Sequence, residues 1–337
     1  MPKVSVIMPV LNEEKYIGKA LDSLLKTSIP PGEMEILVID GGSKDRTREI
    51  VEKYCQRYPF IYLLENPRKI VPVAMNIGIK RARGEYVVRV DAHSIYPVDY
   101  IAQLLYYLEK LNAHNVGGRV VAKMGNNTPT AIAITNTLKD KWGVGSSFRT
   151  VTDSEIREVD TVPFGCYRKE TLEKIGLYDE RLVRNQDIEL NKRLIQKGGK
   201  IYLIPSIEIG YFPRTTFKAF WKNNFLNGYW NILTLYYTGN FNSLSPRHFV
   251  PLTFVVTLVS SFLMGIFYSP FFYIFGIALG SYLLIIGIRS WKVGKNGTNL
   301  FYQFWSFLTL HFSYGIGSLW GIIEVLRQSL KFNRANK

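Results

Sequence analysis

The chain has 337 residues, a length that suits one catalytic domain and an appendage. Hydrophobic residues make up 47% of it, which is enough for a large core and excludes a disordered chain. The formal net charge of +15 is typical of proteins that contact nucleic acid, anionic lipid or phosphorylated substrates. No nucleic-acid-binding module is recognisable, and hydrophobic segments accompany the basic residues. We therefore expect anionic lipid and a nucleoside diphosphate as partners, and no nucleic acid.

Strands and helices alternate through the first third of the chain. Apolar runs of strand length predict strands at residues 4–10, 35–39, 61–64 and 86–90. The helices expected between these strands cover residues 16–25, 45–58 and 71–82. This alternation predicts a parallel sheet with right-handed crossovers.

The next part of the chain is expected to add helices and strands up to residue 204. They are helices at 98–111, 168–175 and 187–196, and strands at 116–122 and 200–204. Residues 125–153 are rich in Asn, Thr, Gly and Ser, which predicts a stretch that is partly loop.

Polar residues follow three of the predicted parallel strands. Asn12 and Glu13 come after the first strand, Asp40 follows the second, and Asp91 follows the fourth. Ligands of such sheets bind beyond the carboxyl ends of the strands, so these side chains are expected to converge on one site. An alternative is that they are helix caps and turn formers, because Asp and Asn favour those positions.

Residues 249–288 contain no Asp, Glu, Lys or Arg. A helical membrane crossing needs about 20 apolar residues, so this stretch predicts two crossings, at about 249–268 and 271–288. A buried hairpin of a soluble protein is the alternative. Basic residues flank the stretch and place both of its ends in the cytoplasm; they are Arg247, Arg289, Lys292 and Lys295.

Two further segments have less distinct patterns. Residues 300–323 are long enough for a third crossing, although a re-entrant or interfacial segment is the alternative. Residues 212–237 interleave basic with aromatic residues, which indicates an amphipathic helix in the membrane interface. The alternative for this segment is an ordinary helix packed on the domain.

Six distinct motifs, each present once, are spread over roughly residues 3–235. They run from Val4 to Glu14, from Val38 to Thr47, over Asn76-Ile77-Gly78, from Ala82 to Val87, over Asp91-Ala92-His93 and from Asn185 to Asn191. Together they resemble family 2 glycosyltransferases with the GT-A fold. The Asp-Ala-His motif and the apolar C-terminal region resemble the succinoglycan-type subgroup of that family.

The resemblance implies an α/β fold with a GT-A, Rossmann-like mixed sheet that binds a nucleotide-sugar, followed by C-terminal transmembrane helices. Residues 1–210 would form the catalytic domain, 211–245 the interfacial helix region, and 246–337 the transmembrane region with a basic tail. No signal peptide precedes the first strand, so we expect the catalytic domain in the cytoplasm. The protein would then be a multi-pass protein of the inner, or plasma, membrane.

The resemblance also implies a set of donor-binding residues. Those expected to bind the nucleotide-sugar, with a UDP-sugar favoured, are Pro9, Asn12, Glu13, Asp40, Asn76 and Asp91. Family members carry an Asp-x-Asp motif whose last Asp holds a divalent metal, and here His93 stands at that position. Asp91 and His93 are therefore the expected ligands of Mn²⁺ or Mg²⁺, and imidazole suits Mn²⁺ better. An alternative is that His93 is a core or capping histidine.

Asp187 matches the catalytic base of the family and begins a predicted helix. A base on the acceptor side implies direct displacement with inversion at the anomeric carbon. Helix capping is the alternative for Asp187. The residues assigned to the acceptor and diphosphate region are Gly165, Gln186, Arg214 and Trp221.

The Gln-x-x-Arg-Trp signature of processive synthases is absent from the chain. We therefore expect transfer of one sugar to a lipid-linked acceptor in cell-surface polysaccharide or glycan assembly. Two alternatives remain open. One is a processive membrane polysaccharide synthase, and the other is a non-catalytic, membrane-tethered nucleotide-binding module.

Overall fold

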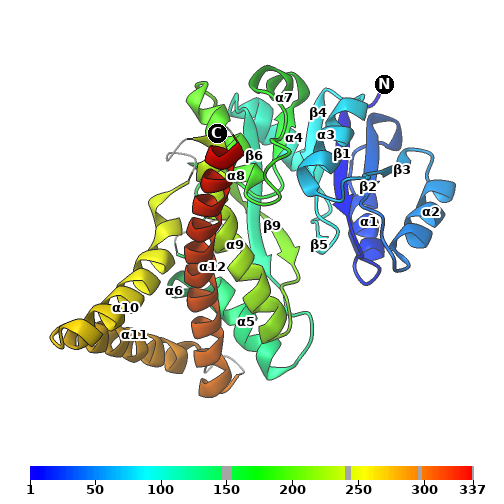
Figure 1. The fold of residues 1–337 in the computed structure, drawn as a ribbon. Coiled ribbons are helices and arrows are strands. Elements are labelled where there is room, and N and C mark those ends of the chain that lie inside the picture. The colour runs from blue at the N-terminus through cyan, green and yellow to red at the C-terminus, as the bar shows by residue number, and fades with distance from the viewer. Residues whose placement is uncertain (146–153, 240–243, 295–297, 336–337) are drawn as a thin grey trace. The chain divides into compact units, whose positions relative to one another are not determined.

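The computed structural model describes residues 1–145, 154–239, 244–294 and 298–335. The chain divides into two compact units. Unit 1 comprises Met1–Val121 and Val151–Phe212, and unit 2 comprises Ala122–Thr150 and Pro213–Lys337. Figure 1 labels the elements of both units.

Unit 1 is built on a mixed sheet, which within the described residues has nine strands. The order is β3-β2-β1-β4-β8-β6-β9-β5, with β7 paired to β9. The parallel half consists of β1 (Val4–Val10), β2 (Met34–Asp40), β3 (Ile61–Glu65) and β4 (Tyr86–Arg89). All seven residues of β2 are buried, as expected for a central parallel strand covered on both faces. The four predicted parallel strands are confirmed.

The antiparallel half begins where β8 (Cys166–Arg168) pairs with β4 and β6 (Asn115–Ala122) pairs with β8. It continues with β9 (Ile201–Tyr211), which pairs with β5 (Ser94–Ile95) and β7 (Arg157–Glu158). The predicted strand at 200–204 is therefore longer than expected and reaches Tyr211. The α/β mixed sheet expected for a GT-A fold is confirmed.

The helices of unit 1 agree with the sequence pattern to within about two residues at most ends. They are α1 (Ile17–Leu25), α2 (Thr47–Arg57), α3 (Val71–Arg81), α4 (Tyr100–Lys110), α7 (Lys169–Ile175) and α8 (Gln186–Gln196). A short 3-10 turn, η1 (Pro31–Glu33), precedes β2.

The motif around Gly84 has a structural explanation. The buried Ser5 hydroxyl donates to Glu35 Oε1 at 2.6 Å and accepts from the Gly84 N–H at 2.9 Å. Arg83 completes the cluster, because its Nε donates to Glu35 Oε2 at 2.9 Å. A Cβ at Gly84 would lie 2.7 Å from the Ser5 nitrogen, so only glycine fits there. These contacts fix the start of β4, which leads to Asp91.

Unit 2 is helical. Its elements are α5 (Pro129–Lys139), α6 (Lys141–Val144), α9 (Phe217–Thr238), η3 (Pro246–Phe249), α10 (Val250–Phe267), α11 (Phe271–Gly294) and α12 (Leu300–Ala335). The stretch at 125–153 was expected to be partly loop, but its described part contains α5 and α6. Residues 146–153 of that stretch lie outside the described residues. Because α5 packs on α12, residues 122–145 associate with the C-terminal helices.

Helices α9 and α12 lie side by side in unit 2 (Figure 1). Their backbones touch at glycines: a Cβ at Gly228 would lie 2.0 Å from the Tyr314 carbonyl oxygen. A Cβ at Gly317 would lie 2.0 Å from the Phe225 carbonyl oxygen. One face of α9 is therefore buried against α12.

Polar contacts join α5 and α6 to the last two helices. Thr137 Oγ1 donates to Ser306 Oγ at 2.8 Å and accepts from Gln303 Nε2 at 2.9 Å. Arg289 Nε donates to Asp140 Oδ2 at 2.9 Å, and this carboxylate also caps α6. Unit 2 thus has a polar interior around α12 as well as apolar packing.

Two helices among the described residues are long and apolar enough to cross a membrane, Pro246–Phe267 and Phe271–Gly294. They form a hairpin that extends away from α12 within unit 2 (Figure 1). Only 22% and 6% of their most apolar windows are buried inside the protein, so most of this apolar surface faces outward. Helix α12 is not one of the two, and the third crossing stays a prediction.

Candidate active site

The polar residues that follow the parallel strands lie at one edge of the sheet, as expected. Strand β1 pairs with β2 so that Val10 stands beside Asp40, and it pairs with β4 so that Ile7 stands beside Arg89. Half-buried Pro9 lies beyond the last β1–β4 pair, so its missing N–H interrupts no ladder on that side.

The loops after β1 and β2 are tied together by hydrogen bonds. The Asn12 N–H donates to Ser43 Oγ at 2.9 Å, and Asn12 Oδ1 accepts from the Lys44 N–H at 2.8 Å. Asn12 has φ of 57°, a left-handed conformation that Asn tolerates. Asp40 is 2% exposed and accepts the Ser43 hydroxyl at 2.6 Å. Its carboxylate holds the loop in place, and a nucleobase would have to use its remaining lone pairs.

His93 lies close to Glu13 and Tyr211. Its Nδ1 is 3.2 Å from Glu13 Oε1, and its ring packs edge-on against Tyr211 with centroids 5.3 Å apart. The Asp91 N–H donates to the Tyr96 hydroxyl at 2.7 Å. Burial raises the pKa of Tyr96 and the charge of Asp91 adds to this, so the phenol stays protonated.

Arg89 is a central residue of the site that the sequence did not reveal. Its side chain is 9% exposed, and Nη2 lies 3.3 Å from Asp91 Oδ1. Nη1 forms an ion pair with Asp187 Oδ2. Burial by itself would lower the pKa of Arg89, but the charges of Asp187 and Asp91 outweigh it and raise the pKa well above the usual value. One cation therefore links Asp91 to Asp187.

Asp187 lies in the first turn of α8, and its side chain is 30% exposed, so it can reach a bound molecule. Asn185, which begins the helix, has a left-handed φ of 62°. Gln186 is buried, and its Oε1 has no hydrogen-bond partner among the residues that the structure describes. The sharp entry into α8 directs Asp187 toward Arg89.

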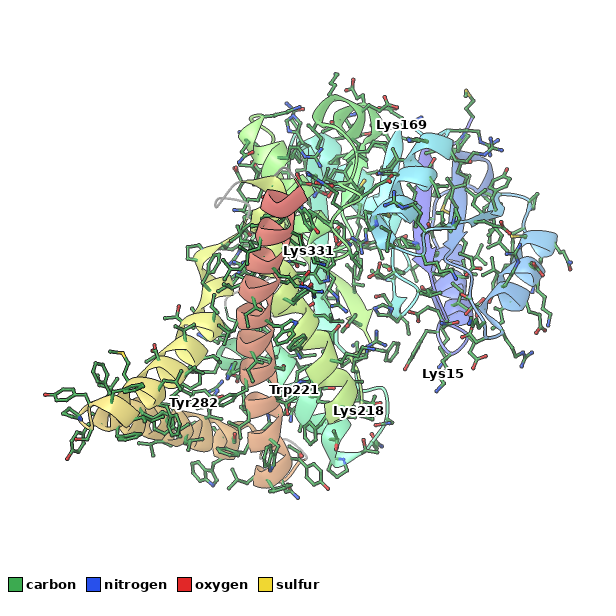
Figure 2. The ribbon with its side chains drawn as sticks, viewed as in Figure 1. Lys15, Lys169, Lys218, Trp221, Tyr282 and Lys331 are labelled. Atoms are coloured by element: carbon green, nitrogen blue, oxygen red, sulfur yellow. The ribbon has the colours of Figure 1, made fainter. Side chains whose placement is uncertain are left out.

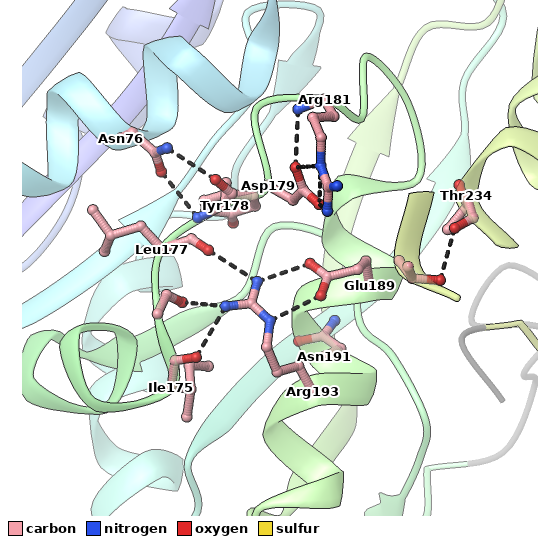
Figure 3. Close-up of polar contacts among 12 residues, drawn as sticks. Asn76, Ile175, Leu177, Tyr178, Asp179, Arg181, Glu189, Asn191, Arg193 and Thr234 are labelled. Atoms are coloured by element: carbon pink, nitrogen blue, oxygen red, sulfur yellow. Dashed lines mark hydrogen bonds and ion pairs between the residues drawn. The ribbon is translucent and has the colours of Figure 1, made fainter. Parts of the chain in front are cut away.

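A polar network anchors α8 to the sheet. Asn191 Oδ1 accepts from Asn115 Nδ2 and from the Tyr167 hydroxyl, each at 2.9 Å. Two residues further along α8, Arg193 pairs with Glu189 and donates to the carbonyl oxygens at the end of α7 (Figure 3). These contacts fix the helix that carries Asp187.

The side chain of Asn76 bonds to the segment between α7 and α8. It is buried in α3, and its Nδ2 donates to the Tyr178 carbonyl oxygen at 2.9 Å (Figure 3). Its Oδ1 accepts the Tyr178 N–H at 2.9 Å, and Nδ2 also lies 2.9 Å from Glu180 Oε1. In this structure, Asn76 therefore positions the segment that leads to α8.

The backbone of Gly165 contacts the backbone of Arg89. Its carbonyl oxygen accepts the Arg89 N–H at 3.0 Å, and a Cβ on it would lie 2.3 Å from Asn115 Oδ1. The preceding Phe164 has φ of 51°, which is unusual for a bulky residue, and its carbonyl oxygen accepts from Tyr100 at 3.0 Å. Close approach of the backbone to Asn115 explains why glycine follows.

Arg214 and Trp221 belong to unit 2. Arg214 is exposed just before α9, and Trp221 lies in the second turn of that helix. The other predicted site residues all belong to unit 1.

Asp91 and His93 offer a carboxylate and an imidazole, which are donor types that divalent cations accept. No group of three His, Cys, Asp or Glu side chains with metal-binding geometry occurs among the described residues. Mg²⁺ and similar cations in phosphate-transfer sites often use one or two protein ligands and several phosphate or water oxygens. A carboxylate and an imidazole, both partly exposed, are suitable for such a site.

Comparisons with known proteins place these features in context. Residues 5–176 match the family model described as "Glycosyl transferase family 2". The chain is 28% identical over 304 residues to the dolichyl N-acetyl-alpha-D-glucosaminyl phosphate 3-beta-D-2,3-diacetamido-2,3-dideoxy-beta-D-glucuronosyltransferase of Methanococcus voltae. That match covers 85% of this chain and 88% of the relative.

A second relative is the succinoglycan biosynthesis protein ExoA of Rhizobium meliloti (strain 1021), 32% identical over 225 residues. It covers 64% of this chain and 66% of its own length. Among solved structures, the mannosyltransferase PcManGT from Pyrobaculum calidifontis, in complex with GDP-Man and Mn²⁺, matches with a TM-score of 0.59. It is 16% identical, and the match covers 95% of this chain and 87% of that one, so it supports the fold.

Proposed function

Because the chain belongs to glycosyltransferase family 2, whose members act on nucleotide-sugar donors, we propose that it moves one sugar from a UDP-sugar to a lipid-linked acceptor. The reaction inverts the anomeric carbon and serves cell-surface polysaccharide or glycan assembly. One observation carries this proposal: Arg89 brings Asp91 and Asp187 to its two sides at the carboxyl edge of the sheet. Asp91 follows the strand that ends at the donor site, and Asp187 is exposed enough to contact an acceptor.

The proposed acceptor class is supported by the relatives. The Methanococcus voltae enzyme is named for a sugar-phosphate lipid acceptor, and the Rhizobium meliloti protein for succinoglycan biosynthesis. A hairpin long and apolar enough to cross a membrane agrees with an acceptor that resides in lipid. We place unit 1 on the cytoplasmic side, because the basic residues that flank the hairpin favour that side.

Residues of unit 1 provide the donor site in this proposal. Asn12 and Asp40 line the nucleoside end, and Asp91 and His93 hold the cation at the diphosphate. The bound cation, Mn²⁺ or Mg²⁺, supplies positive charge that neutralises the leaving diphosphate. A divalent cation at the donor site agrees with the Pyrobaculum calidifontis enzyme, whose structure is a complex with GDP-Man and Mn²⁺.

Asp187 acts as the general base. Its carboxylate accepts the proton of the acceptor hydroxyl while that oxygen forms a bond to the anomeric carbon. The bond from the anomeric carbon to the phosphate oxygen breaks, and its electron pair leaves with the nucleoside diphosphate. Attack from the face opposite the leaving group inverts the anomeric configuration. Arg89 holds the carboxylate of Asp187 in one orientation through a charged hydrogen bond.

A comparison of Asp187→Asn with wild type tests the base assignment. We expect turnover to fall about 10³-fold, within the range that general-base catalysis contributes, while donor affinity changes less than about twofold. Asp22→Asn is the matched control, because Asp22 is a surface carboxylate that bonds Tyr54. Full turnover by Asp187→Asn would remove this residue from the base role.

The donor and the stereochemistry are tested with the same preparation. A panel of UDP- and GDP-sugars is assayed with Mn²⁺ or Mg²⁺ in detergent or lipid, and the anomeric configuration of the product is determined by NMR. We expect a UDP-sugar as donor and a product of inverted configuration. Retention of configuration would contradict direct displacement, and selective use of a GDP-sugar would contradict the UDP assignment.

A further inference from the structure

An apolar groove of about 530 Å³ lies between α9 and α12 in unit 2. Its lining residues come from one face of each helix and are almost entirely apolar; they are Phe217, Lys218, Trp221, Trp305, Leu308, Thr309, Phe312 and Ile316. Trp221 and Trp305 are 40% and 46% exposed, so the groove opens to the surface. Its size lies within the usual range of small-molecule sites.

The groove exists because the contact between the two helices changes along their length. Glycines at positions 228 and 317 let the backbones touch at one part of the pair. Near the start of α9, Phe217 and Tyr302 instead stack their rings with centroids 6.4 Å apart. Bulky side chains hold the helices apart there, and the space between them is left unfilled.

The inner wall of the groove is continuous with the apolar hairpin. The ring of Phe312 packs against Phe254 of α10 at 5.7 Å and against Tyr282 of α11 at 5.9 Å. Outward-facing hairpin residues such as Phe267 and Leu284 are 90% and 65% exposed. Apolar side chains of the hairpin therefore adjoin the wall of the groove, which suits a ligand with a hydrocarbon chain.

The end of the groove at the start of α9 is positively charged. Lys218 lines the groove, and Arg214 and Lys222 are exposed on either side of it in the sequence (Figure 2 labels Lys218 and Trp221). Helix α9 contains no Asp or Glu in its sequence. Its N-terminus, where Thr216 accepts the Ala219 N–H, adds the positive end of the helix dipole. This charge suits a phosphate group.

We propose that this groove binds a phosphate-bearing lipid with a long hydrocarbon chain, with the first part of that chain against Trp305, Leu308 and Phe312 and its phosphate beside Lys218. The proposal rests on the proposed function, because it names the lipid class of the acceptor. An amphipathic ligand is required, since the apolar walls and the basic end lie in one groove. An apolar protein helix would leave the basic end uncompensated.

Binding of a dansyl-labelled C55 polyisoprenyl phosphate to the full-length protein in detergent tests the proposal. Trp221 and Trp305 line the groove and serve as energy donors to the dansyl group. Two unlabelled competitors separate the contributions of the phosphate and of the hydrocarbon chain to binding. C55 polyisoprenol lacks the phosphate, and inorganic phosphate lacks the chain. We expect unlabelled C55 polyisoprenyl phosphate to displace the probe at least about tenfold better than either competitor, about 1.4 kcal/mol.

Paired variants localise the binding. Leu308→Phe fills the groove and is expected to weaken binding about tenfold, while Leu284→Phe makes the same change on the exposed face of α11. Lys218→Ala removes the surface cation at the basic end and is expected to weaken binding about fivefold, while Lys331→Ala is its control (Figure 2). Equal effects of variant and control, or displacement by inorganic phosphate alone, would overturn the proposal.

Failure of this proposal can be distinguished from failure of the proposed function. Asp187→Asn should bind the labelled lipid as wild type does, because Asp187 belongs to unit 1. If Leu308→Phe and Lys218→Ala bind the lipid normally while wild type transfers sugar, the groove is not the lipid site and the proposed function stands. If the lipid binds in the groove but wild type transfers no sugar to lipid-linked acceptors, the proposed function fails.

Discussion

Replacement of Arg89 by Met is the most informative single change in the catalytic unit. Met is unbranched and uncharged, so this substitution removes the cation that pairs with both Asp91 and Asp187. Loss of one partner from a buried ion pair costs about 3–5 kcal/mol. The two carboxylates keep 22% and 30% of their side-chain surface exposed, so water offsets part of this cost and about 2 kcal/mol remains.

This loss is large enough to measure in two ways. For a unit of this size, about 2 kcal/mol lowers Tm by about 4–8 °C. Turnover should fall at least about 10²-fold, because Asp187 loses the group that orients it. Arg181→Met is the matched control: its ion pair with Asp179 is 61% exposed on the arginine side, so Tm should change little.

A double-mutant cycle isolates the interaction between the two residues. Thermal unfolding in detergent, followed by circular dichroism, is measured for Arg89→Met, Asp187→Asn and the double variant. We expect a coupling energy of about 1–3 kcal/mol. Additive effects in the cycle, or wild-type turnover by Arg89→Met, would refute the view that Arg89 orients the base.

Three further predictions concern other parts of the chain. His93→Asp supplies a harder oxygen ligand, so the ratio of activity with Mg²⁺ to activity with Mn²⁺ should rise severalfold in a metal titration; an unchanged ratio would argue against His93 as a ligand. Gly165→Ala places a Cβ 2.3 Å from Asn115 Oδ1, so the variant should unfold at a Tm lower by about 2–10 °C, and a wild-type Tm would show that the backbone moves easily. Asp140→Asn weakens the contact with Arg289 and should speed limited proteolysis of unit 2, whereas equal rates would make that contact unimportant for packing.

The parallel half of the sheet and its polar edge can be predicted from the amino-acid sequence. Strands β1 to β4 are continuous apolar runs, and the crossover rule places the residues after them at the same edge. Asn12, Asp40 and Asp91 can therefore be grouped from the order of strands and helices alone. The hairpin at α10 and α11 is equally predictable, because an uncharged stretch of that length is a local signal.

Long-range packing decided the features that local patterns do not carry. Arg89 and Asp187 are 98 residues apart, and only the antiparallel strands and the anchoring of α8 bring them together. The motifs of the chain do not single out Arg89. The one available signal is its position at the end of an apolar strand, because a charged residue in such a strand usually has a buried partner.

The same reason applies to unit 2. The stretch 125–153 is rich in Asn, Thr, Gly and Ser, yet residues 129–139 within it form α5, which Thr128 caps and which packs on α12. The groove between α9 and α12 depends on which side chains of two distant helices face each other. That arrangement is set by where glycines let the backbones touch and where aromatic rings hold them apart, and therefore by the tertiary structure alone.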